Sequence, residues 1–198
     1  MKFRFDLTQK NKNHDIFFIS DFHLFHANVL RFDKRPFNDV HEMHDYIVKK
    51  WNETVSENDV VFFLGDLSFA KSNEKQGVID IINSLNGTIH FVLGNHDKFD
   101  EIKKLNRFSS INDLAQIRIT HNLNDKAVET SIECFHYPIY SWDKAHHGSI
   151  HLHGHTHGNL HHGETLDYYT NRRVMDVGCM LIDYTPISYK EVINKLIQ

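Results

Sequence analysis

Short apolar runs alternate with helix-like segments along the first half of the chain. Three of these runs are rich in β-branched and aromatic residues, as is typical of strands buried on both faces: 15–20, 59–64 and 88–93. The segments between them carry apolar residues at helical spacing, and Asp39 with Glu42 forms a capping-box pattern before one such stripe. The expected helices are 27–33, a longer one from 39, and 73–85. This alternation predicts right-handed βαβ units with parallel strands.

The second half has a different pattern, in which apolar and polar residues alternate. Two alternating stretches flank a polar loop, which predicts a hairpin. A capping box of Ser188 and Glu191 predicts a terminal helix. We find no repeat, linker or low-complexity segment, and therefore expect one domain over residues 1–198. The strands expected in this half are 115–120, 129–135, 148–153 and 173–179.

The composition is ordinary for a soluble globular protein, with 40% hydrophobic and 24% charged residues among 198. The formal net charge of −4 disfavours nucleic acid as the main partner. Cys134 and Cys179 lie in apolar, strand-like surroundings, and we expect two buried, reduced thiols. The N-terminal residues carry charges where a signal peptide needs an apolar run, and no run is long enough to span a membrane. A cytoplasmic protein is the resulting expectation.

Histidine is unusually frequent, with 17 residues, and one occupies every second position from His151 to His157. An extended backbone would direct these side chains to one face, and Gly154 and Gly158 would allow a close approach. Neutral imidazoles on one face suit a metal ion, whereas the alternative is a histidine-rich surface loop. Ligands elsewhere in the chain would decide between these interpretations.

Five of the apolar runs are followed immediately by side chains that can bind metal. Sites in open α/β sheets form outside the carboxyl ends of the strands, so we expect these side chains to meet. They offer two carboxylates, one amide oxygen and four imidazoles besides His96. That set has more ligands than the four that one tetrahedral zinc ion binds. It suits two divalent ions that share a carboxylate and lie roughly 3.5–4 Å apart. The residues are Asp21, His23, Asp66, Asn95, His96, His136, His155 and His157.

Five motifs resemble, in order, those of the calcineurin-like metallophosphoesterase superfamily: Asp21-Phe22-His23, Gly65-Asp66, Gly94-Asn95-His96-Asp97, His136-Tyr137-Pro138 and Gly154-His155-Thr156-His157. The resemblance implies an α/β fold, a four-layer αββα sandwich with two mixed β-sheets and a dinuclear metal site at the strand C-terminal ends. It also implies how the ligands divide. Asp21, His23 and His157 would bind one metal and Asn95, His136 and His155 the other, with Asp66 bridging. His96 would contact the phosphate as a catalytic residue, and Asp97 would either orient His96 or form a turn.

Two positions depart from the family pattern. Leu24 replaces the usual glycine, and no carboxylate follows shortly after Gly65-Asp66. The run from Asp21 to Phe37 looks like a branch of small bacterial and phage phosphoesterases. The substrate contacts that this similarity suggests are His26, Asn28, Arg31 and Arg35. Arginine suits phosphate because its fork donates bidentately, although a plain surface charge is the alternative for both arginines.

Other histidines receive simpler interpretations. His41 and His44 are expected to be solvated or close to a helix cap, and His153 to be a core histidine or a neighbour of the ligands. The polar segment 159–173, which includes His161 and His162, either lines a substrate pocket or is an exposed loop.

These residues predict metal-assisted hydrolysis of a phosphoester, in which a metal-bound hydroxide attacks phosphorus in line with the leaving alcohol. The expected substrate is a small phosphodiester or phosphomonoester, such as a nucleotide. A metal-dependent nuclease and a non-catalytic binding module on the same fold are the alternatives. Manganese is the expected metal, although iron, zinc, nickel and cobalt suit the same donors. No sequence feature indicates the oligomeric state.

Overall fold

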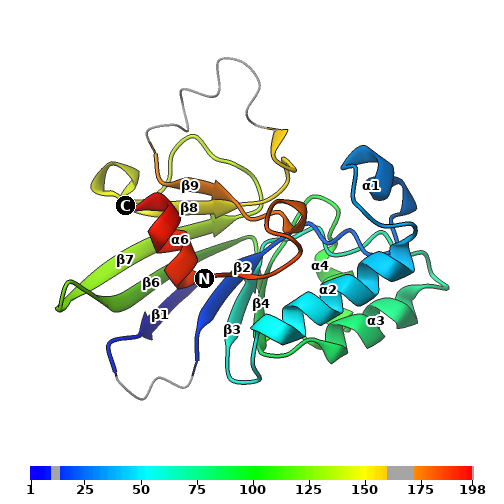
Figure 1. Cartoon of the computed structure of the whole chain (residues 1–198), viewed down its shortest axis with the longest axis horizontal. Coiled ribbons are helices and arrows are strands. Elements are labelled where there is room, and N and C mark those ends of the chain that lie inside the picture. Colours follow the sequence, from blue (N-terminus) through cyan, green and yellow to red (C-terminus); the bar gives the residue numbers. More distant parts are fainter. Residues whose placement is uncertain (10–13, 160–171, 198) are drawn as a thin grey trace.

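The computed structural model describes residues 1–9, 14–159 and 172–197. Its framework is two five-stranded sheets, each with parallel and antiparallel neighbours (Figure 1). The first sheet has the order β10 (Ile187–Ser188), β2 (Ile16–Ile19), β3 (Val60–Phe63), β4 (Thr88–Val92) and β5 (Ser110–Asn112). The second has the order β1 (Lys2–Asp6), β6 (Leu114–Leu123), β7 (Lys126–Phe135), β8 (Ile150–His153) and β9 (Val174–Asp176). The expected α/β class with two mixed sheets is confirmed.

The first sheet is buried on both faces, which explains its continuous apolar runs. In β2, Phe17 and Ile19 pack toward the helices, whereas Ile16 and Phe18 pack toward the second sheet. Each such side chain contributes about 1.5–3 kcal/mol by leaving water. The two sheets therefore share one core, and a second core lies under the helices.

The helices on the outer face of the first sheet carry the predicted apolar stripes (Figure 1). Met43, Ile47 and Trp51 from α2 are fully buried there, and α3 adds Val78 and Ile82. The helices of the chain are α1 (Ala27–Phe32), α2 (Val40–Thr54), α3 (Lys75–Ser84), α4 (Phe99–Lys104) and α6 (Tyr189–Leu196), with 3-10 turns at Ala145–His147 and Cys179–Leu181. Within the described ranges no helix is both long and apolar enough to cross a membrane.

The second sheet is covered differently on its two faces. Helix α6 contributes Tyr189, Val192 and Ile193 to the core between the sheets. On the opposite face Trp142 packs on the ring of His151, with ring centroids 5.2 Å apart. The helical layer on that face is thus thin, and it is built by the segment that follows β7.

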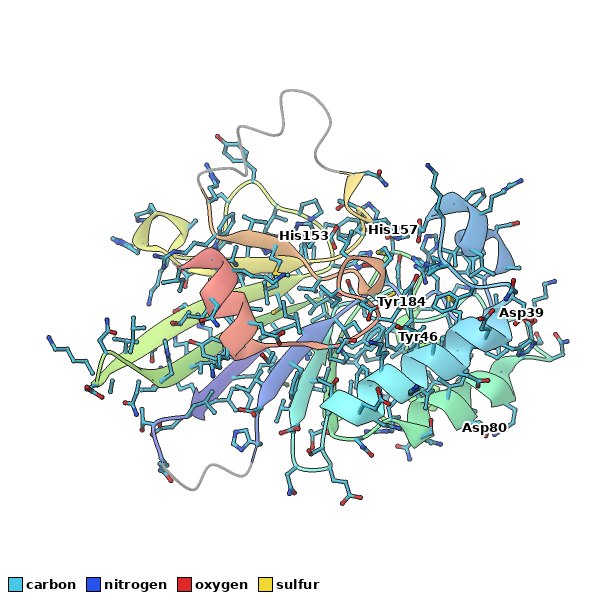
Figure 2. The ribbon with its side chains drawn as sticks, viewed as in Figure 1. Asp39, Tyr46, Asp80, His153, His157 and Tyr184 are labelled. Atoms are coloured by element: carbon cyan, nitrogen blue, oxygen red, sulfur yellow. The ribbon has the colours of Figure 1, made fainter. Side chains whose placement is uncertain are left out.

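Local capping agrees with the sequence in one case and departs from it in another. Ser188 and Glu191 form the predicted reciprocal capping box of α6. Asp39 caps α2 by accepting from the N–H groups of His41 and Glu42 (Figure 2). The Glu42 carboxylate, however, accepts from the N–H of Asn38 at 2.7 Å instead of Asp39, so the box expected there is replaced by a wider turn.

The strand ends of both sheets meet along one edge, where backbone hydrogen bonds join the loops. The N–H of Asp21, after β2, donates to the carbonyl of Gly65, after β3, at 3.0 Å. The N–H of Gly154, after β8, donates to the carbonyl of His136, after β7, also at 3.0 Å. A third bond, from Ser20 to the carbonyl of Val177, links the two sheets. The loops that follow the strands therefore form one connected frame.

Candidate metal centre

Most of the metal-capable side chains leave this frame from left-handed backbone. The φ angles are 60° at Asp21, 52° at His23, 59° at Asp66, 70° at His155 and 48° at His157. Aspartate and histidine adopt this region more readily than most residues do. Tight turns of this kind direct neighbouring side chains toward the common edge of the sheets.

The histidine run does not form one extended row, contrary to the expectation of a shared face. Strand β8 ends at His153, and the rings of His151 and His153 stack 5.4 Å apart inside the protein. Nδ1 of His151 donates to the carbonyl of Glu133, and Nδ1 of His153 donates to the carbonyl of Gly154. Of the four, only His155 and His157, which lie beyond the strand end, reach the groups of ligand-type side chains. Figure 2 labels His153 on the strand and His157 beyond it.

One group of candidate ligands consists of Asp21, His23 and His157. The Nε2 atoms of the two imidazoles are 3.0 Å apart. The Oδ1 atom of Asp21 lies 3.6 Å from Nε2 of His157 and 3.9 Å from Nε2 of His23. Three potential ligand atoms thus converge on one point at the end of β2.

The other group consists of Asp66, His136 and His155, and Asn95 lies among them. Oδ1 of Asn95 is 2.9 Å from Nε2 of His136 and 2.8 Å from Nδ1 of His155. Oδ2 of Asp66 lies 3.5 Å from Nε2 of His136 and 3.8 Å from Nε2 of His23. Asp66 therefore faces both groups, which is the position a bridging carboxylate needs.

The donor atoms fit divalent cations. Metal–nitrogen bonds of about 2.1 Å at right angles place two nitrogens about 3.0 Å apart, which is the His23–His157 separation found here. His136 uses Nδ1 to donate to the carbonyl of Leu64 at 2.7 Å, which directs Nε2 at the Asn95 oxygen. Because Nδ1 of His136 donates to Leu64, Nε2 of the neutral ring and the Asn95 oxygen are both acceptors. A further proton or a metal ion between these two atoms would satisfy both.

The charges within the first group also favour a bound cation. Burial opposes charge on Asp21, yet the nearby His157 and a hydrogen bond from Ser20 keep the pKa of its carboxyl below the ordinary value. Burial also lowers the pKa of His23, to about 4. For His157 burial is outweighed by the nearby Asp21 carboxylate and by the hydrogen bond to Asp33, which raise its pKa to about 10. The buried carboxylates thus favour positive charge at this point.

Asp33 is a functional candidate that the sequence analysis missed. Its Oδ1 accepts from Nδ1 of His157 at 2.8 Å, and its Oδ2 accepts from Nε and Nη2 of Arg35 at 3.0 and 2.9 Å. A carboxylate behind a histidine fixes the ring and turns its other nitrogen toward the metal position. The Asp33-x-Arg35 spacing, just after the short helix, was the available signal.

Arg35 was expected to contact substrate, and the structure contradicts that role. Its side chain is buried, and its guanidinium donates to the carbonyls of Asp21 and Phe22 at 3.0 and 2.9 Å. The remaining bonds go to Asp33 and to Sδ of Met43. With these donors occupied, Arg35 stabilises the ligand loop from inside instead of facing a phosphate.

The predicted catalytic pair His96 and Asp97 separates into two environments. The His96 side chain is 42% exposed, and its Nε2 lies 3.9 Å from Oδ2 of Asp66. Asp97 was expected to orient His96 or to form a turn. The structure agrees with the turn, because the N–H of Asp97 donates to the carbonyl of Gly94 at 3.3 Å. The Asp97 carboxylate accepts from the backbone N–H groups of Asp66, Leu67 and Gly94 at 2.7, 3.1 and 2.9 Å. Asp97 therefore holds the loop that carries Asp66.

The other three predicted substrate contacts lie in two different places. His26 stacks on Phe69, with centroids 4.1 Å apart, and Phe69 in turn lies 4.3 Å from the ring of His96. Asn28 and Arg31 are exposed on α1. Of these three residues, His26 borders the site through Phe69. Most of the segment 159–173, including His161 and His162, lies outside the described residues.

His44 and the cysteines are structural. His44 was expected to be solvated or near a cap, but it is buried, and its Nε2 accepts from the N–H of Phe25 at 3.0 Å. Cys134 and Cys179 are free and buried, as expected.

Comparisons with known proteins agree with this geometry. The model of the calcineurin-like phosphoesterase family matches residues 14–159. The chain is 34% identical to the uncharacterized protein MJ1445 of Methanocaldococcus jannaschii, covering 92% of this chain and 91% of that protein. It is 26% identical to the gene 66 protein of Mycobacterium phage D29, covering 83% of this chain and 87% of the phage protein.

Among solved structures, the crystal structure of AQ665 from Aquifex aeolicus, described as a protein of unknown function, superposes with a TM-score of 0.68 and 26% identity. The match covers 93% of this chain and 100% of that one. Matching motifs, a shared fold and two adjoining groups of ligand atoms lead to one conclusion. The chain belongs to the calcineurin-like phosphoesterase family.

Proposed function

We propose that the protein is a metal-dependent phosphoesterase that hydrolyses a small phosphodiester or phosphomonoester, with a nucleotide as the candidate substrate. The observation that carries the proposal is the pair of adjoining ligand groups, which Asp66 connects. Two divalent ions bound there would polarise the phosphoryl oxygens and lower the pKa of a water molecule. The net reaction adds water across the P–O bond, so that phosphorus gains a hydroxyl and the leaving oxygen gains a proton.

We assign to His96 the contact with the substrate. Its half-exposed ring borders Asp66, while its backbone N–H donates to Oδ1 of Asp66 at 3.0 Å. The hydrogen bond fixes the backbone of His96, while its ring remains open to solvent. Such a ring can contact a phosphoryl oxygen and hold a proton for the leaving oxygen.

Three residues that bond to the candidate ligands support this division of labour. Asp33 orients His157, Arg35 fixes the backbone of Asp21, and Asp97 fixes that of Asp66. The ligand atoms are thereby held in place before any substrate binds, which spares the reaction the cost of ordering them.

A cysteine nucleophile does not fit this site. Cys179 lies close to Asp21, but burial raises the pKa of its thiol to about 12, and Sγ donates to the carbonyl of Asp21 at 3.2 Å. A buried thiol that stays protonated is a poor nucleophile. The thiol instead joins Arg35 in supporting the loop.

Manganese is the metal that we propose. The donors are imidazole nitrogens, carboxylate oxygens and one amide oxygen, without thiolates. Such a set also admits iron, zinc, nickel and cobalt. Metal analysis of the purified protein distinguishes among them.

The experiment is hydrolysis of bis(p-nitrophenyl) phosphate and p-nitrophenyl phosphate by metal-stripped protein to which Mn²⁺ is restored. Asp66→Ala should abolish metal loading and turnover together. His96→Asn should retain the metal and lower kcat by about 10²–10⁴-fold, which is typical for loss of a proton-transfer group. The exposed His147→Asn serves as control. Full activity of Asp66→Ala would refute the bridging role, and metal-loaded protein inactive on both esters would contradict the proposal for this substrate class.

A further inference from the structure

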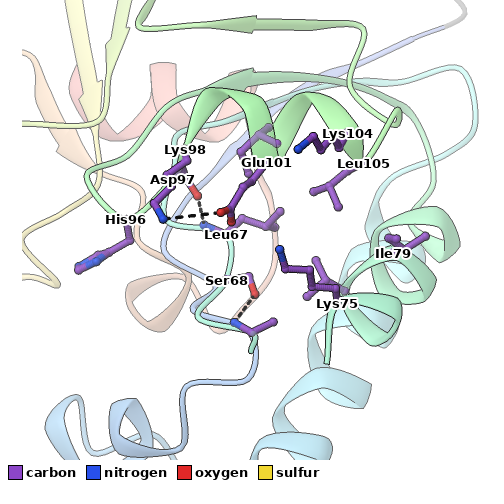
Figure 3. A pocket seen from close by; sticks show the side chains of 13 residues that line it. Leu67, Ser68, Lys75, Ile79, His96, Asp97, Lys98, Glu101, Lys104 and Leu105 are labelled. Carbon is purple, nitrogen blue, oxygen red and sulfur yellow. Dashed lines mark hydrogen bonds and ion pairs between the residues drawn. The ribbon is translucent and has the colours of Figure 1, made fainter. Parts of the chain in front are cut away.

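A pocket separate from the metal groups lies between α3 and α4, and we call it the α3–α4 pocket (Figure 3). Its volume is about 230 Å³. Pockets for whole drug-sized ligands measure about 300–1,000 Å³, so this one suits a part of a molecule. Its apolar lining comes from Leu67, Val78, Ile79, Ile102 and Leu105.

Lysines surround this apolar lining. Lys75, Lys98 and Lys104 all line the pocket, and Figure 3 shows the amines of Lys75 and Lys104 turned toward its open space. Nζ of Lys98 lies 3.6 Å from a carboxylate oxygen of Glu101. Within the described part of the chain, Lys75 and Lys104 have no carboxylate within 4 Å.

The acidic side chains of the pocket do not cancel this charge. Glu101 is shared with Lys98, and the carboxylate of Asp97 already accepts three backbone hydrogen bonds. Two ammonium groups next to an apolar surface therefore remain available. That combination suits an occupant with an apolar ring and an anionic group.

The α3–α4 pocket adjoins His96, the catalytic candidate. His96 lines its edge, and Figure 3 shows the His96 ring directed away from the lysines. On that other side Nε2 of His96 lies 3.9 Å from Oδ2 of Asp66. A substrate whose phosphoryl group reaches the metal groups and whose leaving oxygen meets His96 would extend its leaving portion into the pocket.

We propose that the α3–α4 pocket binds the leaving portion of the substrate, an apolar ring that carries its own negative charge, as in a nucleoside monophosphate. This assignment of the substrate class rests on the proposed phosphoesterase function. The lysines bind the anionic group of the leaving portion, and the apolar lining accommodates the ring. The metal groups are left for the phosphoryl group that is cleaved.

Binding to the metal-free protein tests the pocket without catalysis. The probes are AMP and adenosine, measured by calorimetry on chelator-treated protein. Lys75→Glu combined with Lys104→Glu removes the unpaired charges. Lys71→Glu combined with Lys103→Glu is the matched control, because it makes the same net change at exposed positions next to the pocket residues but outside the lining.

We expect the pocket variant to weaken AMP binding at least tenfold, and the control and adenosine binding to change less than threefold. Equal losses in both variants would show attraction by general surface charge and would overturn the proposal. Absence of AMP binding by the unaltered protein would overturn it too, even if simple phosphoesters are hydrolysed. Conversely, specific AMP binding by a protein that hydrolyses no ester would leave the pocket assigned and contradict the proposed function.

Hydrolysis adds a second readout on the manganese-loaded enzyme. The dinucleotide pApA has a leaving portion with an extra phosphate, and ApA lacks that phosphate. The pocket variant should lower kcat/KM at least tenfold for pApA and less than threefold for ApA. A uniform decrease for both compounds would contradict recognition of a charged leaving portion.

Discussion

Replacement of Asp97 by asparagine tests whether this carboxylate holds the ligand loops. One oxygen accepts from the N–H groups of Asp66 and Gly94, and the other accepts from the N–H of Leu67. An asparagine carbonyl can keep the first two bonds in a weaker, neutral form. Its amide group would then face the N–H of Leu67, a residue with 1% exposure, and leave that donor without an acceptor.

The magnitude follows from these three bonds. A buried donor without a partner costs about 1–3 kcal/mol, and two hydrogen bonds that lose a charged acceptor lose about 1 kcal/mol each. The gain from burying a neutral group opposes this, since burial raises the pKa of Asp97 even though the three N–H groups lower it. We expect a net loss of about 3 kcal/mol, or roughly 6–12 °C in Tm for a chain of this size.

The assay is urea denaturation followed by tryptophan fluorescence, because Trp51 and Trp142 are both buried. Metal affinity is measured in parallel by calorimetry, and it should fall because the backbone N–H of Asp66 loses its anchor. Asp113→Asn, at an exposed position, should change stability by less than about 0.5 kcal/mol. A variant with unaltered stability and metal affinity but reduced kcat would refute this reasoning and restore Asp97 as the partner of His96.

Three further changes probe the frame around the ligands. Asp33→Asn should weaken metal binding about 10–100-fold, because His157 loses its charged partner, and an unaltered affinity in calorimetry would contradict this. Gly94→Ala should prevent metal loading, since a Cβ there would overlap Oδ1 and the backbone N of Asp66; normal metal content would exclude the clash. His44 accepts a hydrogen bond inside the protein, and burial lowers its pKa from 6.5 to about 4. The unfolded chain then binds the proton first, so stability should fall by about 1–2 kcal/mol from pH 6.5 to pH 5, and His44→Gln should reduce this slope in urea titrations at the two pH values.

The meeting of the ligand-type side chains was predictable because it follows from strand direction. Residues placed just after β2, β3 and β4 must share an edge once these strands are parallel. Apolar runs buried on both faces indicated that arrangement directly. The second sheet contributes His136, His155 and His157 to the same edge, as expected from their places after apolar runs. The division of these histidines between two metals was implied by the resemblance to the family and not by local patterns.

Features that depend on distant pairing were not predictable in the same way. Strand β1 pairs with β6, so that Phe3 lies opposite Ile117, far along the chain. The alternation of Phe3 and Phe5 was a signal, but it is too short to distinguish a strand from a charged tail. The inward turn of Arg35 depends on carbonyls of the ligand loop, which no local pattern shows.

The histidine run shows why spacing alone predicts side-chain direction poorly. Alternate residues share a face only while the backbone stays extended. Here the strand ends at His153, and His155 and His157 adopt φ angles of 70° and 48°. Two histidines therefore stay in the core, and two reach the site.

The candidate ligands adopt left-handed backbone, and the hydrogen bonds between the loops offset the cost of this conformation. Each non-glycine residue in this region costs about 1–2 kcal/mol, and Asp21, His23, Asp66, His155 and His157 all adopt it. Such turns persist only where their surroundings hold them. Backbone bonds join neighbouring loops, as from His23 to Asp66, and the carboxylate of Asp21 accepts from the N–H of His155 at 3.1 Å. The strain is therefore balanced by cross-links between loops of both sheets, which can keep the ligand atoms convergent before a metal binds.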